Sequence, residues 1–518
     1  MKLTKKYNLK KHISIVFLTL LSVFLSRNLH AQFVTHHNAI FQPEISIPQA
    51  GINITDPKFG THLKRVTNAR VAGKAGCFPD YSKRQAWNSD QTSLMLRSAN
   101  GSVDIYNGQT YQYEKSLVEI EGVQDIFWHP ANPKIIYYIL NNTFNTINVQ
   151  SLQTNLLFTF SNYSYVSTRA EGNISNDGHY IALCGYDSIF NPIDFFVFNI
   201  FSNSIFSVFP LSGKVSEFDW ISISPLGNYV IVDYANDIAA PYNGLEVYNN
   251  NFNFIWRKPL GAGHSDCGLD ANGNEVLIMD VYDGDSNITY INKYLLMNGT
   301  KTKLLSVSPD FDLHESCRAM LRPGWVYIST FDFIGRLIDD SLSWLPFEDE
   351  IFALKMDGSG DVQRYAHHHS KRYSVITPNS DSSVYFAEPH ATVNKTGTYI
   401  LFGSNWRYKV EQDSSVDAYL IDLSNVLSIG NITNNCAKTE LFNLVPNPVI
   451  DELKFNTNLT IWEINVHVYN TQGILVKIFS LNQDMNTIHL SDLSKGLYFY
   501  QIFDQELNQS GSGKFIKE

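Results

Sequence analysis

The sequence lacks the features of a disulfide framework and of a membrane-embedded protein. It has five cysteines, an odd number without C-x-x-C spacing, and 518 residues are enough to be stabilised by core burial. Cys267 and Cys317 could form one disulfide bridge. Alternatively, all five cysteines are small buried hydrophobic residues. After the first 31 residues no run of eighteen apolar residues occurs, so we expect that the protein is not an integral membrane protein. The cysteines are Cys77, Cys184, Cys267, Cys317 and Cys436.

Several catalytic signatures are also missing. The chain contains no G-x-S-x-G, no H-E-x-x-H and no phosphate-binding P-loop. The acidic segment from Asp280 to Asp285 suggests calcium, but it lacks the glutamate at position twelve of an EF-hand loop, which favours a solvated loop. A pair of catalytic carboxylates, as in glycosidases, is a further alternative, although the spacing of the acidic residues does not identify one pair.

Basic residues are scarce relative to acidic ones. The formal charge is −11, and the first 31 residues carry six Lys or Arg and no acid, so the remainder is near −11 − 6 = −17. Such a chain repels nucleic acid on average, and we expect no nucleic acid partner. An anionic polymer would be bound only at a local basic or metal site.

The first 31 residues have the organisation of a signal peptide. Five lysines precede an apolar run of thirteen residues, Ile13 to Leu25, and Leu29-His30-Ala31 is a cleavage site of small-residue type. The run is too short to span a membrane, which disfavours an uncleaved anchor. We therefore expect export through the Sec pathway.

The last eighty residues predict a small antiparallel β-sandwich. Short β-rich runs are separated by turn residues, among them Asn447-Pro448, Gln472-Gly473 and Lys495-Gly496. Pro446-Asn447-Pro448, Gly473, Gly496-Leu497-Tyr498 and the terminal Lys-Phe-x-Lys resemble, in order, the C-terminal sorting domain (type A) of the type IX secretion system of Bacteroidota. The resemblance implies the type IX machinery as a partner and a secreted or outer cell-surface location. An accessory β domain without an export role is the alternative.

The middle of the chain is a repeat. A turn with Asn, Asp or Pro and Gly leads into a strongly hydrophobic strand in seven copies, for example Ser175-Asn176-Asp177-Gly178 before Tyr180-Ile181-Ala182. The turn glycines Gly178, Gly227 and Gly273 are 49 and 46 residues apart, which is the period of a β-propeller blade. Tandem β-sandwiches, the alternative, would repeat at roughly 90 to 100 residues. We therefore predict an all-β protein, a seven-bladed β-propeller followed by the C-terminal β-sandwich.

The repeat resembles the blades of TolB-like (WD40-like) and oligogalacturonate-lyase-like propellers, a likeness carried by segments such as Ser175 to Ile181. It concerns the fold, from which function does not follow. The predicted division of the chain is a signal peptide 1–31, an N-terminal extension 32–60, a propeller 61–423, a linker 424–440 and a sorting domain 441–518.

Polar and titratable residues recur on the strands expected to line the central channel. Seven positions before the turn glycines stand Glu171, Asp266 and His390, and His264 lies on the same strand face as Asp266 by the period of two. The remaining candidates are His314, Glu315 and Arg318 in blade six, and Arg84 and Arg169 in blades one and three.

Three of these histidines, His264, His314 and His390, come from consecutive blades and are candidate ligands of one divalent metal, Mn, Ca or Zn, with Asp266 as a further ligand. Glu388 or the run His367 to His369 are other fourth donors. Oligogalacturonate lyases have a histidine-rich manganese site in the channel, and the resemblance implies a comparable site. Solvated channel histidines without metal or other cofactor are the alternative.

The candidate chemistry is β-elimination on a uronate-containing glycan. A metal, or Arg169 or Arg318, would neutralise the uronate carboxylate, and His264 or His314 would remove the C5 proton. The arginines can instead pair with Glu171 or Glu315. We therefore expect a secreted carbohydrate-active protein, a polysaccharide lyase acting on a polysaccharide or surface glycan, or alternatively a non-catalytic propeller that binds glycan or protein.

Overall fold

The structure is a computed structural model that describes most of the chain. The predicted signal peptide, most of the predicted linker and Cys436 lie outside the described residues. The described residues are 33–69, 71–72, 76–98, 100–213, 215, 218–234, 244–259, 264–332, 344–370, 385–406, 416–427, 443–456, 463–471, 475–482, 485–504 and 509–518.

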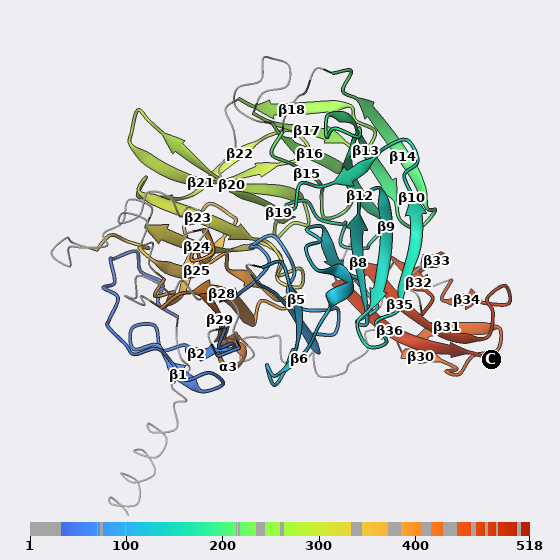
Figure 1. The fold of residues 1–518 in the computed structure, drawn as a ribbon, viewed down its shortest axis with the longest axis horizontal. Helices are drawn as coiled ribbons and strands as arrows, with labels where there is room; N and C mark the ends of the chain where they lie inside the picture. The colour runs from blue at the N-terminus through green and yellow to red at the C-terminus, as the bar shows by residue number, and fades with distance from the viewer. Residues whose placement is uncertain are drawn as a thin grey trace, which may run out of the picture.

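Seven antiparallel sheets follow one another around a ring and confirm the predicted propeller (Figure 1). Five blades have four strands each, and in every one of them the strands pair in chain order. Their strands are β7 (Ile126–Trp128), β8 (Ile135–Leu140), β9 (Thr143–Asn148) and β10 (Thr154–Thr159); β11 (Tyr165–Ser167), β12 (Tyr180–Tyr186), β13 (Pro192–Asn199) and β14 (Ser204–Pro210); β15 (Trp220–Ile223), β16 (Tyr229–Asp233), β17 (Leu245–Asn249) and β18 (Phe254–Lys258); β19 (Ser265–Leu269), β20 (Glu275–Asp283), β21 (Ile288–Leu295) and β22 (Lys301–Val307); β23 (Phe311–Ser316), β24 (Trp325–Asp332), β25 (Glu350–Lys355) and β26 (Val362–His367).

The first and last blades depart from this plan. Blade one has β4 (Ser93–Arg97), β5 (Val103–Asn107) and β6 (Tyr113–Ser116), and a single bridge from Trp87 to Leu94 stands at its inner edge. Blade seven joins both ends of the propeller, because β2 (His62–Arg65) pairs with β29 (Val416–Asp422). The same sheet contains β1 (Asn53–Thr55), β27 (Thr392–Val393), β28 (Tyr399–Ser404) and, parallel to β29, β3 (Gly76–Cys77). The chain therefore closes the ring with an N-terminal strand.

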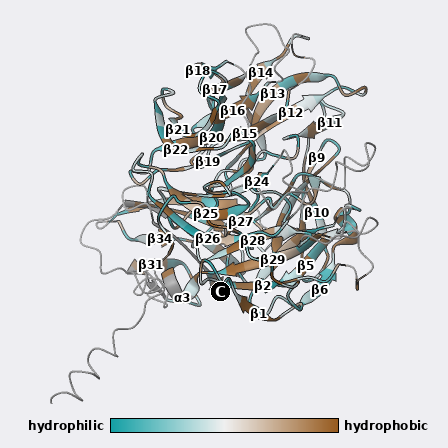
Figure 2. Cartoon of the chain, turned by 90° about the vertical axis from the view of Figure 1, so that its left-hand side faces the viewer, coloured by the Kyte–Doolittle hydropathy of each residue, from teal (hydrophilic) through white to brown (hydrophobic). Residues whose placement is uncertain are grey.

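The repeated turn has the backbone that its glycines predict. Gly178, Gly227, Gly273 and Gly397 have φ of +74°, +77°, +77° and +76°, in the left-handed region where a side chain is strained. The strand after each turn is buried between blades, as Val230 to Val232 of β16 show. Apolar residues, brown in Figure 2, follow the blade strands and form cores between neighbouring blades.

Helix is nearly absent from the described residues. The named elements there are the 3₁₀ turn η1 (Val118–Ile120) and α3 (Ser424–Leu427), and Tyr385 is also helical. None of the helical segments in these ranges is long and apolar enough to cross a membrane. The four described cysteines are free and buried, so Cys267 and Cys317 form no bridge.

The C-terminal domain is the predicted small β-sandwich. One sheet contains β30 (Asn443–Val445), β31 (Glu452–Asn456) and β34 (Thr487–His489), and the other contains β33 (Leu475–Asn482), β32 (Glu463–Tyr469), β35 (Gly496–Asp504) and β36 (Gln509–Lys517). Their facing sides enclose an apolar core that includes Leu453, Val466 and Phe515. Figure 1 shows this domain beside the blade of β8 to β10, on the outside of the ring.

Candidate functional site

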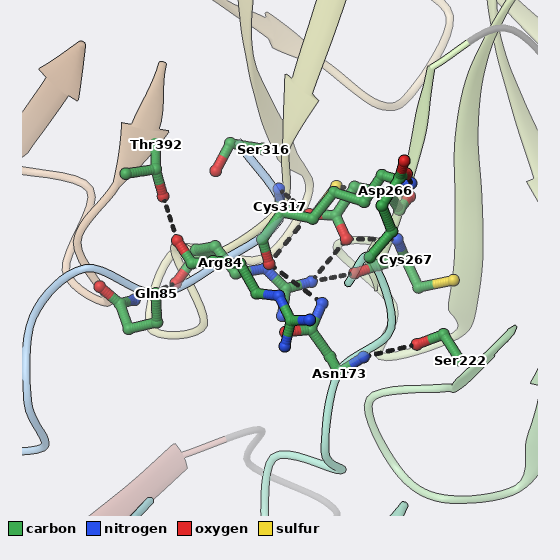
Figure 3. Close-up of polar contacts among 12 residues, drawn as sticks. Arg84, Gln85, Asn173, Ser222, Asp266, Cys267, Ser316, Cys317 and Thr392 are labelled. Carbon is green, nitrogen blue, oxygen red and sulfur yellow. Dashed lines mark hydrogen bonds and ion pairs between the residues drawn. The ribbon is translucent and has the colours of Figure 1, made fainter. Parts of the chain in front are cut away.

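The inner strands are tied to one another by polar side chains (Figure 3). Thr392 Oγ1 of β27 donates to the Arg84 carbonyl at 2.7 Å. The backbone N–H of Asn173 donates to Ser222 Oγ of β15 at 3.0 Å, and the Cys317 N–H donates to Asp266 of β19 at 2.7 Å. These bonds hold neighbouring blades in one register around the axis. Polar residues on the innermost strands therefore serve the ring itself as well as any site.

The three candidate histidines meet. His264 directly precedes β19, His314 lies in β23 and His390 precedes β27. The ring of His314 has its centroid 4.2 Å from that of His264 and 4.3 Å from that of His390. The Tyr81 ring lies against this row, 5.7 Å from His314 and 5.2 Å from His390. Adjacent blades thus bring three imidazoles into contact at one part of the channel.

A glutamate completes the cluster. Glu388 Oε2 lies 3.7 Å from His314 Nε2 and 3.6 Å from His390 Nε2, and one donor atom from each of the three residues lies within 4.8 Å of the others. Neither ring nitrogen of the fully buried His314 has a hydrogen-bond partner among the described residues, and neither does His390 Nε2. Buried polar atoms without partners are costly, and two imidazoles with a carboxylate suit a divalent transition metal. His314, Glu388 and His390 therefore fit a metal ion.

The protonation states of the two buried histidines suit ligation. Burial, together with the charges of His264 and His390, lowers the pKa of His314 well below its usual value. Burial and the charge of His264 lower the pKa of His390 to about 3. Both rings are therefore neutral at physiological pH, which is the form that binds metal.

His264 behaves differently from its neighbours. Burial alone would lower its pKa, but the hydrogen bond and charge of Asp312, and the charges of Asp280 and Glu171, raise the pKa of His264 to about 9. Its Nδ1 lies 3.1 Å from Asp312 Oδ1, and its side chain is 31% exposed. Asp312 thereby fixes the proton on Nδ1 and leaves Nε2 to face other groups. His264 is therefore the most exposed member of the row.

Asp266 and Arg318 lie apart from the histidines. The Arg318 guanidinium binds both carboxylate oxygens of Asp266, at 2.8 and 3.1 Å, and donates to the Cys267 carbonyl. The N–H groups of Cys317 and Cys267 also donate to Asp266. Arg318 follows His314 by four residues, roughly 13 Å along an extended strand. These two residues form a buried ion pair, and Asp266 does not belong to the group of His314, Glu388 and His390 whose donor atoms lie within 4.8 Å of one another.

The other basic side chains of the channel are paired, with one exception. Lys83 binds Glu171 at 2.5 Å, and Arg84 binds Asp125 at 3.0 Å. Arg169 is exposed and its Nε donates to the Asp219 carbonyl at 3.4 Å, but it has no ion pair among the described residues. The charges of Arg169 and His264 both act on the pKa of Asp219, so the two cations face one region. Arg169 is therefore the available cation near the histidines.

Several acidic side chains lie near the histidines, and the sequence analysis did not identify most of them as site residues. Burial and Asp219 raise the pKa of Asp233 to about 7, and burial raises the pKa of Asp280 to about 6. Burial and Asp280 raise the pKa of Glu315 well above its usual value. Asp312, two residues before His314, could have been found from the same period of two that identified His264. No sequence pattern of this kind identifies Tyr81 or Lys83 as site residues.

The run His367 to His369 has a structural place. His367 Nε2 contacts the Ile40 carbonyl at 2.9 Å and His368 Nε2 contacts the Thr330 carbonyl at 2.9 Å. The His369 ring stacks on Trp406 at 4.3 Å. The run therefore joins the N-terminal extension and blade seven to blade six, outside the histidine row.

Known proteins resemble the chain in both of its parts. Residues 443–518 match the family model described as secretion system C-terminal sorting domain. The oligogalacturonate lyase of Vibrio parahaemolyticus superposes with a TM-score of 0.50 and 12% identity, over 72% of this chain and 96% of that one. An oligogalacturonate lyase in complex with manganese gives 0.50 and 14%, over 73% and 97%. No curated protein matches the sequence. The predicted sorting tail and the lyase-like propeller fold are thereby confirmed, and at these identities the structural likeness concerns the fold alone.

Proposed function

We propose that this secreted propeller is a metal-assisted polysaccharide lyase that cleaves uronate-containing glycans by β-elimination. One observation carries the proposal: His264, held by Asp312 and partly exposed, lies in contact with a buried His314–Glu388–His390 donor set. A base beside a site for positive charge is what removal of a proton next to a carboxylate requires. Manganese in a lyase of the same fold supports the proposal by analogy.

A divalent cation held by His314, Glu388 and His390 would polarise the substrate carboxylate, acidify the C5 proton and favour the neutral form of the adjacent His264. The chain's own residues do the rest. Asp312 accepts from His264 Nδ1, so Nε2 is the atom that takes the C5 proton. Protonated at Nε2, the same ring can return a proton to the departing glycosidic oxygen.

Arg169 is suited to bind the substrate carboxylate from the other side. The residue is exposed, its Nε donates to the Asp219 carbonyl, and its charge acts on the pKa of Asp219, but it forms no ion pair among the described residues. Arginine recognises carboxylates with two parallel N–H groups, which also fixes the plane of the carboxylate. Arg318 is left with a structural role by its bond to Asp266.

The alternative is a non-catalytic propeller that binds glycan or protein at the cell surface. The pairing of Lys83, Arg84 and Arg318 with acids favours it, because these cations are engaged in holding blades together. The two functions differ in one property, the formation of an unsaturated product.

The experiment uses the chain without residues 1–31. Metal content is measured by mass spectrometry, and polyuronates of several types are assayed for the ultraviolet absorbance of unsaturated uronate. We expect the double variant His314→Ala/His390→Ala to bind one ion per chain fewer than the parent chain, and the parent chain to form product from at least one polymer. Absence of both the ion and the product overturns the proposal, and the ion without product on any polymer favours the binding alternative.

We further propose that the chain is made in a member of Bacteroidota, crosses the inner membrane by the Sec pathway and reaches the outer surface or the medium through type IX secretion. The matched sorting domain supports the type IX step. Residues 1–31 are proposed as the signal peptide, 32–60 as an extension, 61–423 as the propeller, 424–440 as the linker and 441–518 as the sorting domain. Mass spectrometry of the secreted chain tests these boundaries.

A further inference from the structure

The sorting domain rests on the propeller through one face of its larger sheet. Along β32, Val466 and Val468 point into the sandwich core, so the alternate residues His467 and Tyr469 belong to the opposite face. That face would be solvated in an isolated sandwich, yet His467 is 4% exposed and Tyr469 is fully buried. The propeller covers it.

The contact is specific in its apolar and polar parts. Tyr469 packs in one cluster with Ala131 and Phe201 of the propeller, and its ring lies 4.5 Å from His129. Tyr469 Oη donates to the Asp177 carbonyl at 2.6 Å, and Gln501 Nε2 donates to the Asn176 carbonyl at 3.3 Å. The partner segment on the propeller is therefore the turn that leads into β12.

Two histidines and an aspartate gather at this joint. The rings of His179 and His467 lie 4.6 Å apart, and His179 Nδ1 lies 3.2 Å from Asp177 Oδ2. One donor atom from each of the three residues lies within 4.8 Å of the others. His179 Nε2 is enclosed and has no hydrogen-bond partner among the described residues.

We propose that Asp177, His179 and His467 bind a divalent cation of the zinc class, which fastens the sorting domain to the propeller. A tetrahedral ion with bonds of about 2.1 Å separates its ligand atoms by roughly 3.4 Å, close to the Asp177–His179 spacing. Imidazole nitrogens with a carboxylate favour zinc over magnesium or calcium. Asp177 also supplies the negative charge that a buried cation needs.

The Asp177 carboxylate is held in place by its other oxygen, because Ser175 Oγ and the His179 N–H both donate to Asp177 Oδ1. Asp177 Oδ2 is the oxygen that lies toward His179. The site is distinct from the channel histidines, since its ligands come from blade three and from the sorting domain.

The test uses the full chain without residues 1–31, carrying His314→Ala and His390→Ala so that the channel donors are absent. Zinc bound per chain is counted by mass spectrometry after equilibration and removal of free ion. His467→Gln and, on the propeller side, Asp177→Asn are the test variants. His489→Ala is the matched control, because His489 lies in the same domain, is 73% exposed and faces Glu452 instead. Circular dichroism verifies that each variant is folded.

We expect one zinc per chain in the background protein and in His489→Ala, and at least a tenfold loss of affinity in both test variants. Hydrogen exchange supplies a second measurement: zinc should slow exchange in residues 174–180 and 463–469 together. Unchanged zinc binding in folded His467→Gln or Asp177→Asn, or zinc protection confined to one of the two segments, overturns the proposal.

Discussion

At the residue scale, three histidines in contact have three different environments. His314 and His390 are enclosed and neutral, whereas Asp312 stabilises the charged form of His264. In the proposed mechanism, this difference divides the row into two metal ligands and one proton-transfer group. The division depends on one carboxylate, and it can be tested by removing that charge.

Asp312→Asn is predicted to lower the pKa of His264. The charged imidazolium loses both a hydrogen bond and a neighbouring negative charge, so protons leave it at lower pH. We expect the rising limb of the lyase pH–rate profile to move to lower pH, with kcat reduced on the order of a hundredfold or more because the ring is no longer oriented. A limb at the wild-type pH would contradict the assigned role of Asp312.

Another buried histidine, His367, should make the stability of the fold depend on pH. Burial lowers the pKa of His367 to about 3, while the unfolded chain has the ordinary value near 6.5. Below pH 6.5 His367 is therefore protonated in the unfolded chain but not in the folded chain. The free energy of unfolding falls as the pH falls from 6.5 toward 3. His367→Gln keeps a donor for the Ile40 carbonyl and removes this effect.

Urea unfolding at pH 6.5 and pH 5 measures the difference. Between these values the wild-type chain should lose about 1.6 kcal/mol more than His367→Gln, from 1.36 kcal/mol per pKa unit and an unfolded histidine that is already half protonated at pH 6.5. Equal losses in the two proteins would show that His367 is able to take up a proton in the folded state.

At the element scale, the blade turns were predictable and the channel pairs were not. The turn depends on residues within one stretch of chain, so Gly178, Gly227 and Gly273 identify it locally. The partner of a channel residue lies on another blade some fifty residues away, as Asp266 and Arg318 show. The sequence places Asp266 on the same strand face as His264, but it does not reveal that Arg318 of the next blade holds the Asp266 carboxylate.

Two of the turn glycines form a matched pair for a test. Both Gly227 and Gly273 have φ of +77°, but a Cβ at Gly227 would lie 2.8 Å from the Tyr180 ring of the neighbouring blade, whereas the space at Gly273 is open. Gly273→Ala should cost about 1–2 kcal/mol of backbone strain. Gly227→Ala should cost more, and denaturant unfolding with equal costs would contradict this account of blade contact.

At the scale of the whole molecule, the chain is a closed ring with its two ends joined in blade seven. Arg65 of β2 donates to Asp417 of β29 at 2.6 Å, and Thr67 and the Ala69 N–H donate to the other oxygen of the same carboxylate. Asp417 thus accepts hydrogen bonds from three residues of the N-terminal segment where the ring closes. The N-terminal strands β1 and β2 complete blade seven, because the strands after Trp87 supply only β27, β28 and β29 to that sheet.

Asp417→Ala should therefore weaken the entire ring. It removes the charged partner of Arg65, the nearer acceptor of Thr67 Oγ1 and the acceptor of the buried Ala69 N–H, and we expect a loss of about 3–5 kcal/mol. Asp361→Ala is the control, because Asp361 is 62% exposed and pairs only with the exposed Lys355, a pair contributing about 0–1 kcal/mol. Similar unfolding free energies for the two variants would contradict the closing role of Asp417.

The central claim is that the histidine row performs β-elimination, and the most direct measurement is the initial rate of unsaturated uronate formation. The metal-equilibrated wild-type chain is compared with His264→Ala and with His489→Ala on the same panel of polyuronates. The account predicts a steady increase in absorbance for wild type and His489→Ala on at least one polymer, and a rate at least a hundredfold lower for His264→Ala. Product formed equally fast by His264→Ala, or by none of the three proteins on any polymer, would contradict it.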